Sequence, residues 1–249
     1  MEPLIASSTL ADIAGLLALS PPGWGGTLLH GLANSIVIAL GAFGFGLILG
    51  TLGAYGKLYG GPVVRDLMAV YTTLVRAVPD LVLILALNFA GVDLFNQLML
   101  SLGYDRVQPN GLILGILVLG VVQGAYSTEV IRGAILAVPP GQIEAARAYG
   151  MPTLLQMRRV TLPLMLSNAI PGMANLWLIA TKDTALLALV SVKELTLMTQ
   201  QAAATTKAYF TFFLAAGLLY LLISLVSERL FALLERRARR GQPSLNVDG

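Results

Sequence analysis

The side chains of this sequence best suited to chemistry are charges set inside long apolar stretches. Arg76 and Asp80 stand four residues apart beside Pro79, and Glu129 precedes Arg132 by three. A charge at the centre of a membrane helix costs about 2.5–3.5 kcal/mol on insertion scales, so such residues usually face a bundle interior or a water-filled path. Arg76 and Asp80 would share a helix face. They form either an internal ion pair or a site where Asp80 attracts a ligand's cationic group, whereas Glu129 and Arg132 favour an i,i+3 pair.

A second polar group lies in a later apolar stretch. Asn168 and Asn175 are seven residues apart, which predicts that they share one face with Pro171 of a helix that this proline interrupts. Three further polar residues end the stretch: Thr181, Asp183 and Thr184. The group either lines a water-filled path or bonds a neighbouring helix, and its residue types favour neither alternative.

Several other kinds of chemistry are excluded. Without cysteine the chain has no thiolate nucleophile or Cys-ligated metal, and a single histidine, His30, makes a metal site implausible. His30 is expected to lie at the membrane interface. The nearest approach to a phosphate-binding loop, residues 51–58, lacks the first glycine and has Leu58 where Ser or Thr should hold Mg²⁺. We therefore expect no metal and no cofactor in this chain.

Apolar elements must position these side chains. Of 249 residues, 56% are hydrophobic and 12% are charged, half the charged fraction of a soluble domain. The charges delimit five predicted spans, residues 31–55, 66–90, 107–128, 160–181 and 208–227. In the first span, Gly46 and Gly50 either allow a neighbouring helix to approach closely or reflect the general tolerance of glycine in membrane helices. Residues 1–30 carry no basic residue, so we expect no signal peptide there but an interfacial segment.

The positive charges predict the orientation of the spans. Eleven cations would lie on one side: Lys57, Arg65, Arg132, Arg147, Arg158, Arg159, Arg229, Arg236, Arg237, Arg239 and Arg240. The other side would hold four: Arg106, Lys182, Lys193 and Lys207. By the positive-inside rule the N-terminus is outside and the C-terminus is cytoplasmic. The arginine-rich residues 236–249 form a cytoplasmic tail that is expected to contact anionic lipid headgroups, since a net charge of +3 does not suit a nucleic-acid partner.

The longest cytoplasmic loop, residues 133–163, predicts a short helix-turn-helix. Pro140 can begin a helix, Gly150 can end it, and Pro152 can begin a second helix over residues 153–160. The alanines at 145, 146 and 148 would give this element a small-residue face that could enter a groove of a partner.

The same loop carries a motif. Its fixed positions are Glu144, Ala145, Ala146, Gly150, Val160, Leu162 and Pro163. They resemble the EAA-x3-G-x9-I-x-LP motif of permease subunits of ATP-binding-cassette importers, with Val160 in place of isoleucine. Residues 124–142, including Gln142, and residues 71–83 look like the polar amino-acid branch, especially the histidine/lysine/arginine/ornithine permeases and their opine-importing relatives.

The resemblance, which covers roughly residues 32–235, implies a type I importer permease, a five-helix bundle spanning residues 31–235 in the bacterial inner membrane. It also implies that the loop helix docks on a separate ATPase that binds ATP and Mg²⁺. The expected complex contains a second, related permease, two ATPase subunits and a periplasmic binding protein. The expected substrate is histidine, lysine, arginine, ornithine or an opine, and the candidate path residues named above would line its route.

Three alternatives remain beside this interpretation. A related permease could instead carry glutamine or glutamate. An intramembrane hydrolase would need a base near a nucleophile, and His30 at the edge of a span is a poor candidate. A non-transporting scaffold would not require the complete loop motif.

Overall fold

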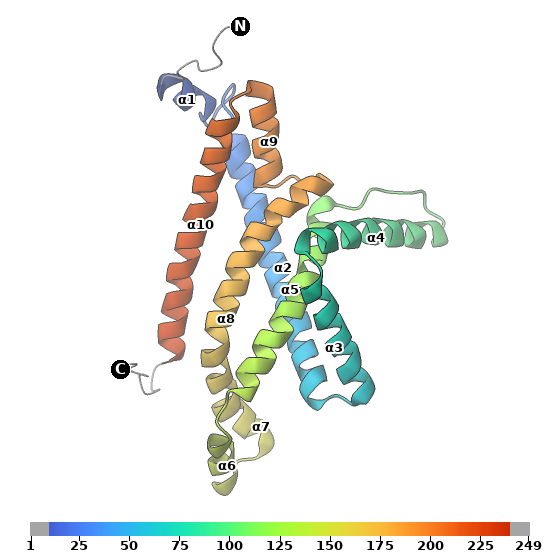
Figure 1. Ribbon diagram of the computed structural model, residues 1–249, viewed down its shortest axis with the longest axis vertical. Coiled ribbons are helices and arrows are strands. Elements are labelled where there is room, and N and C mark those ends of the chain that lie inside the picture. Colours follow the sequence, from blue (N-terminus) through green and yellow to red (C-terminus); the bar gives the residue numbers. More distant parts are fainter. Residues whose placement is uncertain (1–9, 240–249) are drawn as a thin grey trace. The chain divides into compact units, whose positions relative to one another are not determined.

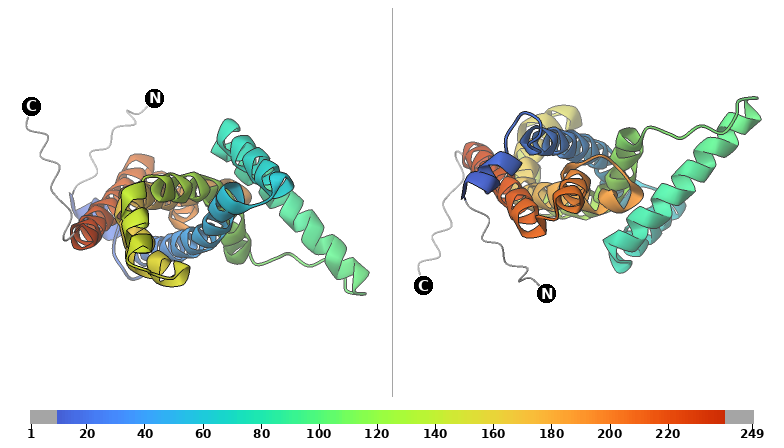
Figure 2. Two further views of the ribbon diagram at one scale, coloured as in Figure 1. Left: turned by 90° about the horizontal axis from the view of Figure 1, so that it is seen from below. Right: turned by 90° about the horizontal axis from the view of Figure 1, so that it is seen from above.

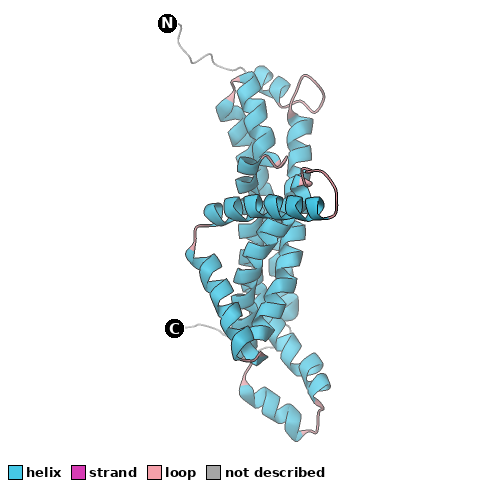
Figure 3. Ribbon diagram, turned by 90° about the vertical axis from the view of Figure 1, so that its right-hand side faces the viewer, coloured by secondary structure: helices cyan, strands magenta, loops and turns pink. Residues whose placement is uncertain are grey.

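The computed structural model describes residues 10–239, and every regular element among them is a helix (Figure 3). The beginning of the expected interfacial segment, residues 1–9, and the end of the expected tail, including Arg240, lie outside the described residues. Most of the helices are labelled in Figure 1. They are α1 (Leu10–Leu16), α2 (Gly25–Tyr59), α3 (Pro62–Ala77), α4 (Asp80–Ser101), α5 (Gly111–Leu136), α6 (Pro140–Ala148), α7 (Thr153–Gln156), the π-helix η1 (Met157–Thr161), α8 (Leu162–Asp183), the 3₁₀-helix η2 (Thr184–Val190), α9 (Leu195–Thr206) and α10 (Tyr209–Ala238).

Five helical segments of the described chain are long and apolar enough to cross a membrane. They are α2, α4, α5, the continuous segment Thr153–Val190, and α10. This confirms the predicted all-α architecture with five spans. Several helices are longer than their apolar stretches: α2 continues past Lys57, and α10 continues past Arg229 to Ala238. Lys and Arg end an apolar stretch without ending a helix, because they are good helix formers whose long side chains can reach the lipid headgroups.

The predicted second span, residues 66–90, is wrong. The structure has two helices there, α3 and α4, which are separated at Val78 and Pro79. Val78 is extended, with φ −96° and ψ 139°. A residue before proline is driven out of the helical region by the proline ring, and proline itself has no N–H to continue the ladder. The candidate span therefore begins at Asp80 and reaches Ser101.

The chain forms two compact units. The first contains the described residues up to Ala42 together with Leu81–Leu119 and Thr181–Ile223, and the second contains Phe43–Asp80, Gly120–Ala180 and the described residues from Ser224. In the first unit, Ile84 of α4 packs in one buried cluster with Ile38 of α2 and Leu187 of η2. Figure 2 shows that the C-terminal half of α4 projects away from the other helices of this unit.

In the second unit, α2 and α5 approach each other closely. A Cβ atom added to Gly46 would lie 2.8 Å from the Cβ of Gln123, and one added to Gly50 would overlap Ser127. Only glycine leaves room for this approach, so the close packing that the Gly46-xxx-Gly50 pair suggested is confirmed.

Candidate functional site

The first part of the loop motif, from Glu144 to Gly150, lies on a helical hairpin in the second unit, formed by α6 and α7 (Figures 1 and 3). The motif's last residues, Val160, Leu162 and Pro163, lie in η1 and at the start of α8. Pro140 begins α6, and Gly150 follows its end with a φ of +71°. The N–H of Gly150 bonds the carbonyl of Arg147 at 2.9 Å, and that of Met151 bonds Ala146 at 3.0 Å. Glycine adopts this left-handed conformation without the steric cost of a Cβ. Both the predicted helix stop and the start of a second helix after Pro152 are confirmed.

The second helix of the hairpin does not end where it was predicted to end. α7 covers only Thr153–Gln156, and the π-helix η1 then joins it to α8. Pro163 has no N–H for a helical bond to a preceding carbonyl. The N–H of Leu162 reaches back to Met157, and the wider turn keeps the chain helical up to the proline.

Most of the candidate coupling residues are exposed. Gln142, Glu144, Ala145 and Gly150 are exposed on the hairpin, and Leu162 and Pro163 are exposed at the start of α8. Ala146 differs, because it is 5% exposed. The predicted small-residue face is therefore incomplete, because Ala145 and Ala148 are exposed and Ala146 is buried.

Two apolar side chains of the hairpin lie outside the motif and are strongly exposed. Tyr149 is 86% exposed and Leu154 is 78% exposed. The sequence offered a weak signal for them, since both flank the Gly150 turn. Both side chains leave apolar surface on the hairpin that the described chain does not cover.

Arg76 and Asp80 do not form the expected ion pair. The break at Pro79 puts them on different helices, and within the described part of the chain they do not bond each other. Arg76 is exposed, whereas a carboxylate oxygen of Asp80 accepts a hydrogen bond from the Tyr126 hydroxyl at 3.1 Å. The predicted internal ion pair, which would have stabilised the break at Pro79, is therefore wrong.

Glu129 joins three helices of the second unit. One carboxylate oxygen contacts Lys57 of α2 at 2.5 Å, and the other contacts Arg132 at 2.9 Å, which confirms the predicted i,i+3 pair. The Lys57 ammonium also donates to Thr72 of α3 at 2.7 Å. The sequence places Lys57 only among the cations of the cytoplasmic side, because its partners Glu129 and Thr72 are distant in the sequence. Both oxygens of Glu129 are already bonded, which favours a structural role.

The amides of α8 lie on its surface. Asn168 and Asn175 are both exposed, as expected for residues on one face. The predicted interruption at Pro171 is wrong, because α8 runs through this residue. A proline removes one backbone hydrogen bond from a helix, and the remaining bonds of a long membrane helix can hold it together.

The three residues that follow α8's apolar stretch belong to the first unit. Thr181 and Thr184 are buried, and the Thr184 hydroxyl donates to the Thr181 carbonyl at 2.8 Å. Asp183 is half-buried. The hydroxyl of Thr184 thus bonds its own chain.

A buried carboxylate in the first unit was missed. Glu194 is fully buried and accepts hydrogen bonds from the backbone N–H groups of Thr196 and Leu197 at the start of α9. The hydroxyls of Ser35 and Tyr220 also donate to it, at 3.3 and 3.1 Å. Burial raises the pKa of the Glu194 carboxyl above its usual value. Its position between apolar stretches gave no sign of burial, because its partners come from α2 and α10.

No group of three or more His, Cys, Asp or Glu side chains that could hold a metal ion occurs within residues 10–239. The polar clusters described above are held by internal hydrogen bonds and ion pairs, and the exposed hairpin is an element suited to contact another protein.

Comparison with known proteins identifies the family. The family model for the binding-protein-dependent transport system inner membrane component matches residues 42–240. A nopaline transport system permease protein of Agrobacterium fabrum is 42% identical over 228 residues, which cover 91% of this chain and 97% of that protein. A histidine/lysine/arginine/ornithine transport system permease protein of Salmonella typhimurium is 38% identical over 215 residues, covering 86% and 94%.

A solved structure agrees with this family. The crystal structure of an amino acid ABC transporter with histidines matches the fold with a TM-score of 0.72 at 25% identity, over 86% of this chain and 95% of that chain. The family match covers most of the chain, and the two relatives cover nearly all of it. The chain therefore belongs to the binding-protein-dependent transport system inner membrane components, and it is a multi-pass permease subunit of an ATP-binding-cassette importer whose ATPase is a separate subunit.

Proposed function

We propose that this permease carries a basic amino acid or an opine across the bacterial inner membrane, toward the cytoplasm. The observation that carries the proposal is the exposed hairpin with the Glu144–Gly150 part of the permease motif, in a chain similar over nearly its full length to permeases named for nopaline and for histidine, lysine, arginine and ornithine. The excess of cations on the loops that include the hairpin supports a cytoplasmic hairpin and C-terminus, and an N-terminus on the outer side.

The partner at the hairpin is the ATPase. The exposed residues Gln142, Glu144 and Ala145 present polar and small groups of α6, while Tyr149 and Leu154 supply the apolar area. Buried Ala146 and left-handed Gly150 keep the hairpin in shape. Closure of the ATPase around ATP and Mg²⁺ would move the hairpin, and η1 and α8 would carry that movement into the spans.

The complete importer contains a second, related permease, two ATPase subunits and a periplasmic binding protein. In this chain, residues 31–235 form the permease domain and residues 133–163 form its coupling loop. The substrate route is lined by polar groups of the spans. Of the candidate residues, Arg76, Asn168 and Asn175 are exposed, and Asp80 and Asp183 are half-buried.

The test is uptake by proteoliposomes that contain the complete complex, the binding protein and ATP. Labelled arginine, histidine and nopaline should accumulate, and labelled glutamine and glutamate should not. Gly150→Pro should abolish uptake, because proline holds φ near −65° and the hairpin needs +71°.

The matched control is Gly141→Ala in the same hairpin, where a Cβ meets no atom within 4 Å. This variant should transport like wild type. Uptake that survived Gly150→Pro would contradict coupling through the hairpin and would favour a scaffold. Uptake of glutamine in preference to arginine would replace the substrate class but not the coupling.

A further inference from the structure

Two polar side chains near the middle of α5 are buried without a hydrogen-bond partner. Gln123 is 1% exposed and Ser127 is fully buried. Neither the amide of Gln123 nor the hydroxyl of Ser127 bonds any group of the described chain. The two residues are four positions apart and therefore share one face of the helix. Unpaired groups inside a membrane cost free energy, since the bilayer core offers no water to replace the missing bonds.

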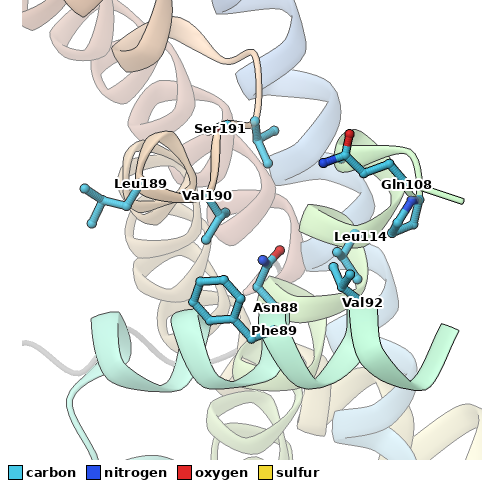
Figure 4. A pocket seen from close by; sticks show the side chains of 11 residues that line it. Asn88, Phe89, Val92, Gln108, Leu114, Leu189, Val190 and Ser191 are labelled. Carbon is cyan, nitrogen blue, oxygen red and sulfur yellow. The ribbon is translucent and has the colours of Figure 1, made fainter. Parts of the chain in front are cut away.

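A buried polar side chain that borders open space is in a different position. Asn88 of α4 points into a cavity of about 450 Å³ in the first unit (Figure 4), and its amide is not one of the buried groups that lack a partner. Gln123 and Ser127 lie instead against the backbone of α2, where Gly46 and Gly50 leave no room for a Cβ atom. A partner for them has to be brought by a movement of the packed helices themselves.

The contact between α2 and α5 in the second unit suits such a movement. Four of its close approaches have a glycine on one side: Gly46 lies against Gln123, Gly50 against Ser127, Gly53 against Thr128, and Gly124 against Leu49. A glycine has no Cβ against which a neighbouring side chain could lock, so one helix can shift along the other with little steric resistance. Helix shifts of about 1–2 Å are a common form of switching movement.

We propose that Gln123 and Ser127 are positioning residues for a movement of α5 along α2 during transport. Both are unpaired in the conformation that the structure shows. In the second conformation of the cycle they donate to carbonyl groups of α2, whose second lone pairs the glycines leave uncovered. A group that is paired in only one of two conformations shifts the equilibrium between them. This inference rests on the proposed function in one respect, that the permease alternates between two conformations as its ATPase binds ATP.

The test compares the thermal stability of the permease–ATPase complex without nucleotide and with a non-hydrolysable ATP analogue. Gln123→Met keeps the length of the side chain and removes its hydrogen bonds, and Ser127→Ala removes only the hydroxyl. Each variant should raise the Tm in the state where the native group is unpaired, because an apolar atom then replaces an unsatisfied polar one, and should lower the Tm in the other state. We expect shifts of about 2–4 °C in opposite directions.

Thr128→Val is the matched control on the same helix. Thr128 is also fully buried, but its hydroxyl donates to the carbonyl of Gly124 in its own helix at 2.7 Å. That bond moves with α5 and is the same in both conformations. Thr128→Val should therefore shift the Tm in one direction in both states and leave arginine uptake near the wild-type rate. Gln123→Met should slow uptake by about three- to tenfold, because it favours one conformation.

The movement itself can be measured between two spin labels. Leu52→Cys on α2 and Gly133→Cys on α5 place the labels at exposed positions, and the chain has no native cysteine. In the otherwise wild-type complex, the distance between the labels should change when the ATP analogue is added. With Gln123→Met, one of the two distances should predominate in both nucleotide states.

Tm shifts of Gln123→Met in the same direction in both states would overturn the proposal, because the amide would then have the same surroundings throughout. An unchanged distance in the wild-type complex would overturn it as well, since α5 would not move along α2, and uptake by that same complex would leave the proposed function intact. If the wild-type complex with its binding protein transported no amino acid or opine, the proposed function would fail. The label distances and Tm values would still decide whether α5 moves along α2.

Discussion

Glu194 shows that the burial and the pKa of a charged residue can depend on residues far away in the sequence. Its carboxylate caps α9 through two backbone N–H groups, yet Ser35 and Tyr220 enclose it from other helices of the first unit. Desolvation opposes the charged form more than these donors favour it, so its pKa is raised. No local pattern separates this glutamate from an exposed loop residue, which is why sequence analysis did not find it.

The raised pKa of Glu194 predicts a pH dependence of stability. Between its unfolded pKa, near 4.5, and its higher folded pKa, the folded state binds more protons than the unfolded state. The contribution of Glu194 is therefore fully present below about pH 4.5 and is lost as pH rises through the folded pKa. Thermal unfolding of the detergent-solubilised permease from pH 4.5 to 8 should show this loss, and Glu194→Gln should lack it. A constant difference in Tm between wild type and variant would contradict the prediction.

At the scale of elements, hydropathy and charge were enough to predict five spans, and glycine and proline were enough to predict the hairpin. The wrong predictions concern prolines inside the spans: a second span that continued across Pro79, and an interruption at Pro171. Pro79 ends α3, whereas Pro171 leaves α8 continuous and Pro163 is accommodated by η1. All three lack the same N–H group, and the difference lies in how neighbouring turns adjust. That adjustment depends on packing, which local sequence does not encode.

The approach of α2 to α5 predicts a strongly position-dependent effect of glycine substitutions. Gly50→Val should destabilise the second unit by about 1–3 kcal/mol or more, because its Cβ would overlap Ser127 and the packed helices cannot both keep their positions. Gly44→Val is the matched control on the same helix, where a Cβ meets no atom within 4 Å. Thermal unfolding in detergent should show a clear loss of Tm for the first variant only. Equal effects would mean that helix propensity, not close packing, explains these glycines.

At the scale of the whole molecule, orientation depends on a sum of charges and not on any one residue. Exposed cations such as Arg158 and Arg159 on the hairpin segment lie beside the ATPase-docking surface that we propose. Orientation and coupling are therefore one hypothesis, since an ATPase that uses cytoplasmic ATP can reach the hairpin only if the cation-rich loops face the cytoplasm.

The absence of native cysteine allows this orientation to be tested directly with single cysteines. Asp105→Cys lies in the predicted outer loop after α4, and Gly61→Cys lies in the predicted inner loop before α3, where both positions are exposed. A membrane-impermeant maleimide should label Asp105→Cys in intact spheroplasts and label Gly61→Cys only after lysis. Because both thiols are exposed, a difference between them reports the side of the membrane and not burial. The reverse pattern would put the hairpin outside, away from ATP, and the importer mechanism would need another site of energy input.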